Sequence, residues 1–145
     1  MTIKSWLSKI KESLESMDKL VIDNNVPRTL LNYAKYLYDR NLNTQAIITL
    51  QITVESSVAI KNGRNVDELG DYDWWQNYGK NYLRNSKNQN WKDLKDLQTL
   101  EKIRNQIAHG GGKDKLNGKP SASNLPNIFK KSFSCVEKLL EILEF

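Results

Sequence analysis

Apolar residues recur every three or four positions along this chain, which is the spacing of one face of an α-helix. No segment alternates apolar and polar residues as a half-buried strand does. The pattern predicts helices over residues 2–22, 27–38, 44–61, 71–85, 91–107 and 127–144. We therefore expect an all-α fold, a compact bundle of about five to six helices.

Local features mark several helix boundaries. Pro27 suits a first helical turn, where a missing N–H costs nothing, and Asn43 or Thr44 is expected to cap the helix that ends at Lys61. The β-branched run over 47–54 resembles a strand, but the length of its segment favours a helix. Consecutive glycines after His109 end the helix that opens at Trp91.

Composition restricts the function classes. The chain carries 22 Lys and Arg residues against 17 Asp and Glu residues, a net charge of +5 that favours anionic partners. The single cysteine excludes an intrachain disulfide and, with a single histidine, argues against a His/Cys zinc site. No apolar run reaches the roughly 20 residues of a membrane span. Acidic residues within 2–22 suit neither a secretory signal nor a transit peptide. We expect a cytoplasmic protein without metal or cofactor.

The segment from Ile103 to Gly111 carries the sharpest chemical signal. Arg104 follows apolar residues by four and seven positions, so it emerges on the apolar side of its helix, where a guanidinium needs a carboxylate, a phosphate or another subunit. His109, at the helix end, has the side chain best suited to proton transfer near neutral pH. Asn105 lies one turn before His109 on the same face.

The pattern Arg104-Asn105-x3-His109 resembles the R-x4–6-H signature of HEPN ribonucleases. The surrounding helices are similar to the HEPN half of CRISPR-associated CARF–HEPN effectors, over roughly residues 25–145. We therefore expect one HEPN-like domain over 1–145, without the N-terminal CARF-type sensor domain. The HEPN toxins of toxin–antitoxin pairs usually have a tyrosine two residues after the histidine, where this chain has Gly111.

The resemblance implies metal-independent cleavage of single-stranded RNA by attack of the 2′-hydroxyl, in prokaryotic antiviral defence. It also implies a composite site in a homodimer, which would unite two copies of the single imidazole. In that site His109 is the general acid or base, Arg104 holds the scissile phosphate, and Asn105 orients His109 or touches phosphate. A regulatory partner or a sensor domain is also compatible with the resemblance.

Each of these residues also has a simpler interpretation. His109 could merely interact with the helix dipole, and Arg104 could pair with Glu101 three residues earlier. Glu55 is either a residue that fixes Arg104 or the dimer, or an ordinary solvated glutamate. The loop lysines Lys113, Lys115 and Lys119, followed by Lys130 and Lys131, either steer the RNA backbone or are simply solvated.

The aromatic residues of 71–85 and the cysteine are expected to pack in the core. Tyr72, Trp75, Tyr78 and Tyr82 trace one helical face, although Trp74, Trp75 and Tyr78 could instead stack bases. Cys135 is in register with apolar positions, which predicts a buried, inert thiol. Two other functions remain open: a non-catalytic helical interaction module that binds a protein partner or nucleotide, and a basic bundle that binds RNA without cutting it.

Overall fold

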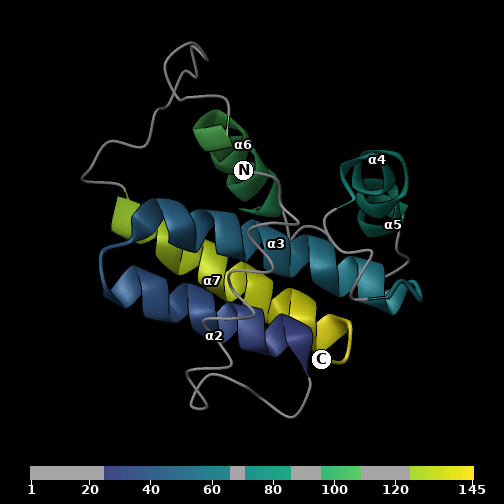
Figure 1. Ribbon diagram of the computed structural model, residues 1–145, viewed down its shortest axis with the longest axis horizontal. Coiled ribbons are helices and arrows are strands. Elements are labelled where there is room, and N and C mark those ends of the chain that lie inside the picture. The colour runs from purple at the N-terminus through teal and green to yellow at the C-terminus, as the bar shows by residue number, and fades with distance from the viewer. Residues whose placement is uncertain (1–24, 66–70, 86–95, 109–124) are drawn as a thin grey trace.

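A computed structural model describes residues 25–65, 71–85, 96–108 and 125–145. All regular secondary structure in these ranges is helical, which confirms the prediction of an all-α bundle (Figure 1). The helix predicted over 2–22, the first residues, 91–95, of the helix predicted over 91–107, and residues 109–124 lie outside the described residues. No helix in the described ranges is both long enough and apolar enough to cross a bilayer.

Helices α2 (Val26–Asp39) and α3 (Asn43–Lys61) form a hairpin. The Asn25 side chain caps α2 by accepting the Arg28 amide at 3.1 Å, and Pro27 occupies the first turn as predicted. The expected cap of α3 by Asn43 or Thr44 is wrong, because α3 already begins at Asn43 and Leu42 precedes it without a side-chain cap. Asn41, at φ 61°, makes this tight connection possible.

Helix α3 is the central element of the bundle and packs against α2, η2, α6 and α7 (Figure 1). Its residues from Thr49 to Ala59 are all buried, so the helix is enclosed rather than amphipathic. The buried hydroxyls of Thr49, Thr53 and Ser57 donate to backbone carbonyls one turn earlier, at 2.7 to 2.8 Å. The strand-like run is thus helical, as its length predicted.

Helix α7 (Leu125–Ile142) packs against α2, α3 and α6. Cys135 is buried on this helix, as predicted. Glu137 lies beside α2, where its carboxylate accepts from Arg28 at 2.6 Å and from Lys35 at 2.9 Å. These bonds join two helices that are far apart in sequence.

The hydrogen bond from Lys35, followed by that from Arg28, lowers the pKa of Glu137 below its ordinary value of 4.5. The unfolded chain then binds more protons than the folded chain just below pH 4.5, so stability falls as the pH drops through the lowered pKa. We expect wild type to be more stable than Glu137→Gln above pH 4.5 and to lose this advantage in more acidic buffer. Urea unfolding of both proteins across pH 3 to 7 measures the difference, and a pH-independent gap would contradict the prediction.

Helices α4 (Tyr72–Trp74), η2 (Trp75–Gly79) and α5 (Lys80–Asn85) form one continuous segment. The Lys80 amide donates to the Trp75 carbonyl five residues earlier, which makes η2 a π-helical turn. The prediction that these aromatic residues share one face is wrong: Trp75 is 3% exposed, whereas Tyr72 and Tyr78 are 53% and 65% exposed. The extra residue in the π-turn shifts the register of the side chains that follow. Buried Trp75 is therefore not placed to stack bases.

Gly79 closes the π-turn against the indole of Trp75. A Cβ at this position would collide with Trp75 Cε3 and lie 3.0 Å from Trp74 Cζ3. We expect Gly79→Ala to lower the free energy of unfolding by about 1–3 kcal/mol, because an overpacked core must shift its side chains. Chemical denaturation measures the loss. Gly63→Ala is an informative comparison, since its cost would come from the positive φ of 81° and not from a collision.

Helix α6 (Asp96–Ala108) crosses α3 and also contacts α7 (Figure 1). Leu97, Leu100 and Ile103 are buried, as the spacing of three predicted. This apolar stripe fixes the rotation of α6 about its axis. It thereby directs Glu101 and Arg104 toward neighbouring helices.

Candidate functional site

The centre of the candidate site is an ion pair between α6 and α3. Arg104 Nη2 donates to Glu55 Oε1 at 2.9 Å, across 49 positions of sequence. The two side chains are only 11% and 8% exposed. Because α3 is enclosed by its neighbours, Glu55 is a buried carboxylate and Arg104 is its cationic partner.

Burial raises the pKa of the Glu55 carboxyl above its ordinary value of 4.5, and the nearby Arg104 guanidinium opposes this shift. The folded state thus favours a proton on Glu55 more than the unfolded chain does, even though the carboxylate has a cationic partner. A charged Glu55 depends on Arg104 for most of its compensation.

This geometry decides two alternatives that the sequence left open. Glu101 does not pair with Arg104; its carboxylate instead accepts from Lys80 Nζ at 2.5 Å. Glu55 is not a solvated glutamate, because it is buried and bound to Arg104. The Arg104 guanidinium, which emerges on the apolar side of α6, therefore pairs with a carboxylate on another helix, that of Glu55 on α3.

The structure describes only some of the other predicted site residues. Asn105 follows Arg104 on α6 and is partly buried. His109 lies outside the described residues, one position beyond Ala108, where α6 ends. Lys113, Lys115 and Lys119 also lie outside them, whereas Lys130 and Lys131 are exposed near the start of α7. The catalytic and RNA-binding roles of these residues stay predictions.

The ion pair with Glu55 engages only part of the Arg104 guanidinium. A guanidinium carries five N–H donors in a planar fork, and the bond to Glu55 engages one of its terminal nitrogens. A carboxylate on one side can therefore orient the group while its other donors face a second acceptor. No three His, Cys, Asp or Glu residues of the described ranges gather into a potential metal site.

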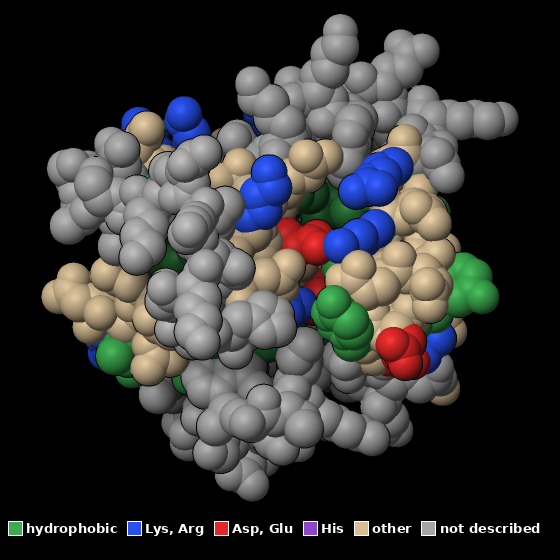
Figure 2. All heavy atoms as spheres, turned by 90° about the horizontal axis from the view of Figure 1, so that it is seen from above, with side chains coloured by type: hydrophobic (Ala, Val, Ile, Leu, Met, Phe, Trp, Pro, Cys, Tyr) green, Lys and Arg blue, Asp and Glu red, His purple; other side chains and the backbone are tan. Residues whose placement is uncertain are grey.

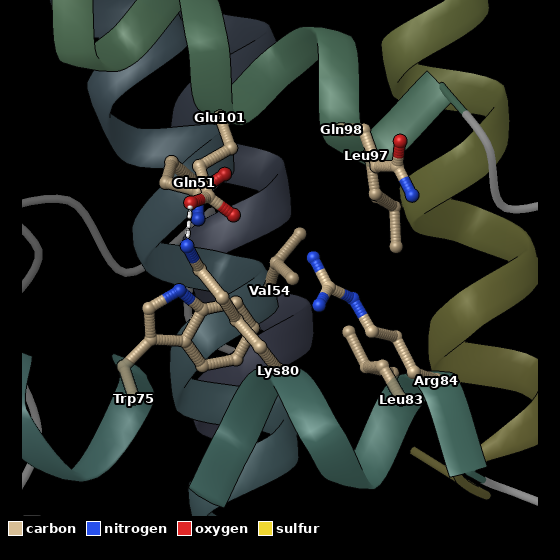
Figure 3. Close-up of a pocket in the computed structure, with 9 residues that line it drawn as sticks. All are labelled: Gln51, Val54, Trp75, Lys80, Leu83, Arg84, Leu97, Gln98 and Glu101. Carbon is tan, nitrogen blue, oxygen red and sulfur yellow. Dashed lines mark ion pairs between the residues drawn. The ribbon is translucent and has the colours of Figure 1, made fainter. Parts of the chain in front are cut away.

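Sequence reasoning missed a polar cluster that adjoins the pair. Gln51 precedes Glu55 by one turn of α3, and Glu101 precedes Arg104 by about one turn of α6. Gln51 and Glu101 line a pocket together with Trp75, Lys80 and other residues (Figure 3). No short motif signals this cluster, because its members come from separate helices.

Comparisons with protein-family models, curated proteins and solved structures find no match to this chain.

Proposed function

We propose that this chain is a metal-independent endoribonuclease of the HEPN type that cleaves single-stranded RNA at a site shared by two copies. The observation that carries the proposal is the buried Arg104–Glu55 pair. Arg104 lies on α6, whose last residue, Ala108, directly precedes His109 in the sequence. A guanidinium buried against a carboxylate of a central helix is held in a defined position, which a phosphate-binding group requires. Support also comes from the Arg104-x4-His109 pattern and its context.

The reaction needs two proton transfers. The RNA 2′-oxygen attacks the adjacent phosphorus and the bond to the 5′-oxygen breaks, which leaves a 2′,3′-cyclic phosphate and a 5′-hydroxyl. One imidazole accepts the proton of the 2′-hydroxyl, and a second, protonated imidazole donates a proton to the leaving 5′-oxygen. This chain has a single histidine, so the two imidazoles are supplied by His109 of two copies.

The other residues have electrostatic and positioning roles in this proposal. Arg104 stabilises the negative charge that develops on the phosphate oxygens. Glu55 positions Arg104 through the bond to Nη2. Asn105 orients His109 or contacts phosphate, and the loop lysines Lys113, Lys115 and Lys119 attract the RNA backbone. The proposed setting is prokaryotic antiviral defence.

The test incubates the purified chain with unstructured RNA in buffer that contains EDTA, beside the variant His109→Ala. We expect wild type to produce fragments with 2′,3′-cyclic phosphate ends and the variant to produce almost none. Mass spectrometry of the fragments identifies the end groups. Equal cleavage by both proteins, or cleavage that requires added Mg²⁺ or Mn²⁺, would refute the mechanism.

A second candidate function is a non-catalytic helical interaction module that binds a protein partner or nucleotide. The specific observation in its favour is that Arg104 is only 11% exposed and already has an ionic partner. In such a module the pair serves the stability of the α3–α6 contact. RNA that stays intact with wild type, together with a partner complex that Arg104→Met abolishes, would favour this function over the nuclease.

A further inference from the structure

A second ion pair lies one turn of α6 away from the Arg104–Glu55 pair. The Lys80 ammonium of α5 binds the Glu101 carboxylate of α6 at 2.5 Å (Figure 3). All four side chains are largely buried, with exposed fractions between 8% and 22%. Helix α6 therefore contributes a cation to one pair and a carboxylate to the other, and the two pairs join it to α3 and to α5.

The carboxylates of the two pairs compete for Arg104. Glu101 precedes Arg104 by three residues on α6, a spacing at which opposite charges on one helix can pair. Burial is the main cause that raises the pKa of Glu55, and the negative charge of Glu101 adds to the rise. Arg104 is thus close to two carboxylates, yet it is bonded to Glu55 and not to Glu101.

Lys80 removes Glu101 from this competition. The Lys80–Glu101 pair adjoins the apolar side chains of Leu83 and Leu97, so the attraction between the two charges is screened less than at an open surface. Without Lys80, a carboxylate that is only 18% exposed would lose its counter-charge, which is costly. Arg104, three residues away on the same helix, is placed to replace it.

Proximity to Glu101 alone does not make a basic residue its partner. Figure 2 shows an acidic side chain recessed among basic ones, at a hollow of the face on which α5 and α6 lie. Arg84, one turn after Lys80, lines the same pocket as Glu101, but it is exposed and forms no ion pair with Glu101 (Figure 3). The largely buried Lys80 is the cation that Glu101 binds.

We propose that Lys80 is a positioning residue of the candidate site, which holds Glu101 away from Arg104 so that Glu55 alone directs the guanidinium. The inference rests on the proposed function, in which Arg104 must be aimed at the scissile phosphate. Lys80 contacts no reacting atom in this role and acts only through Glu101. The role affects the rate, because misplacement of a catalytic group by about 1 Å can cost about 10²-fold.

The experiment measures RNA cleavage by wild type, Lys80→Met and the double variant Lys80→Met/Glu101→Gln, each shown to be folded by circular dichroism. Lys80→Met leaves Glu101 unpaired, and we expect kcat to fall at least about tenfold while KM changes little. Removal of the competing charge in the double variant should restore kcat to within about twofold of wild type. Lys80→Arg, which keeps a cation for Glu101, should retain full activity. Should Lys80→Met not fold, Lys80→Gln takes its place.

The matched control is Arg84→Gln, which removes one positive charge one turn later on α5. This variant should cleave RNA as wild type does, because Arg84 is not the partner of Glu101. An equal loss of kcat in Arg84→Gln and Lys80→Met would show that α5 merely attracts RNA by its charge. A double variant that stays as slow as Lys80→Met would show that the pair only stabilises the fold. Either result overturns the proposal.

A spectroscopic readout separates this inference from the nuclease. The Arg104 side-chain N–H signals of the ¹⁵N-labelled full chain are assigned by their absence in Arg104→Met. We expect these signals to move in Lys80→Met, to return in the double variant, and to stay in place in Arg84→Gln. If the chain cleaves no RNA, this pattern still supports positioning by Lys80 while the nuclease proposal fails. Signals that stay in place in Lys80→Met contradict the positioning role, whatever the cleavage assay shows.

Discussion

A ninefold excess of the His109→Ala chain is expected to lower RNA cleavage by a fixed amount of wild-type chain about tenfold. The proposed site needs one imidazole as base and one as acid, each of which contributes on the order of 10²–10⁴ to the rate. A mixed dimer has one imidazole and should be nearly inactive. After random subunit exchange, about 1% of the enlarged pool of dimers contains two wild-type chains, which is about a tenth of the wild-type dimers present before mixing. Formation of cyclic-phosphate product, with RNA in large excess over protein, measures the effect.

The matched control is the same excess of the Lys102→Gln chain, whose change lies at an exposed position of α6. That chain keeps His109, so total cleavage should rise in proportion to total protein. If the His109→Ala chain leaves wild-type cleavage unchanged after exchange, each chain works alone and the composite site is wrong. Excess RNA ensures that the inactive chain does not act merely by binding the substrate.

The fold was largely predictable because helical spacing is a local property of the sequence. The pattern placed α2 and α3 within one or two residues of their ends and identified α7 with a similar error. Helix α3 was the difficult case, since its β-branched residues and buried hydroxyls resemble a strand. Its hydroxyls are satisfied within the helix itself, which is why a polar sequence can occupy the centre of the bundle.

The segment around Trp75 shows what spacing alone misses. The predicted aromatic face assumed regular turns of 3.6 residues, but the bond from Lys80 to Trp75 spans five. The π-turn depends on how closely Gly79 and the Trp75 indole approach each other, which is a matter of packing. A glycine within an aromatic run is the one sequence feature that hints at this approach.

The sequence predicted that Arg104 needs a negatively charged partner, but it did not identify that partner. The spacing of α6 indicated that Arg104 emerges on the apolar side and requires a negative charge. It did not choose between Glu101, three residues away, and Glu55, which is 49 positions away. The choice depends on the crossing of α3 and α6 and on Lys80, which binds Glu101 from α5. Both are contacts between helices that no local pattern encodes.

Glu55→Ala is expected to lower the free energy of unfolding by about 3–5 kcal/mol, because it leaves the Arg104 guanidinium buried without a counter-charge. Glu55→Gln should cost less, since an amide oxygen can still accept from Nη2. Urea unfolding at pH 7 measures both variants. The matched control is Glu137→Ala, which also breaks an ion pair to arginine, but at a site where the glutamate side chain is 34% exposed. We expect this control to cost about 0–1 kcal/mol.

The double variant Glu55→Leu/Arg104→Met separates the cost of an unpaired charge from the value of the pair itself. Replacement of both partners by apolar side chains removes the buried charges together, so the double variant should be more stable than Glu55→Ala. If the pair serves stability alone, RNA cleavage by the double variant should match that of wild type. If Glu55 instead positions Arg104 on the scissile phosphate, the double variant should fold well and cleave RNA at least about 10²-fold more slowly, because it lacks a donor to the developing charge. A stable double variant with full activity would therefore remove Arg104 from the mechanism, and with it the main support for the nuclease.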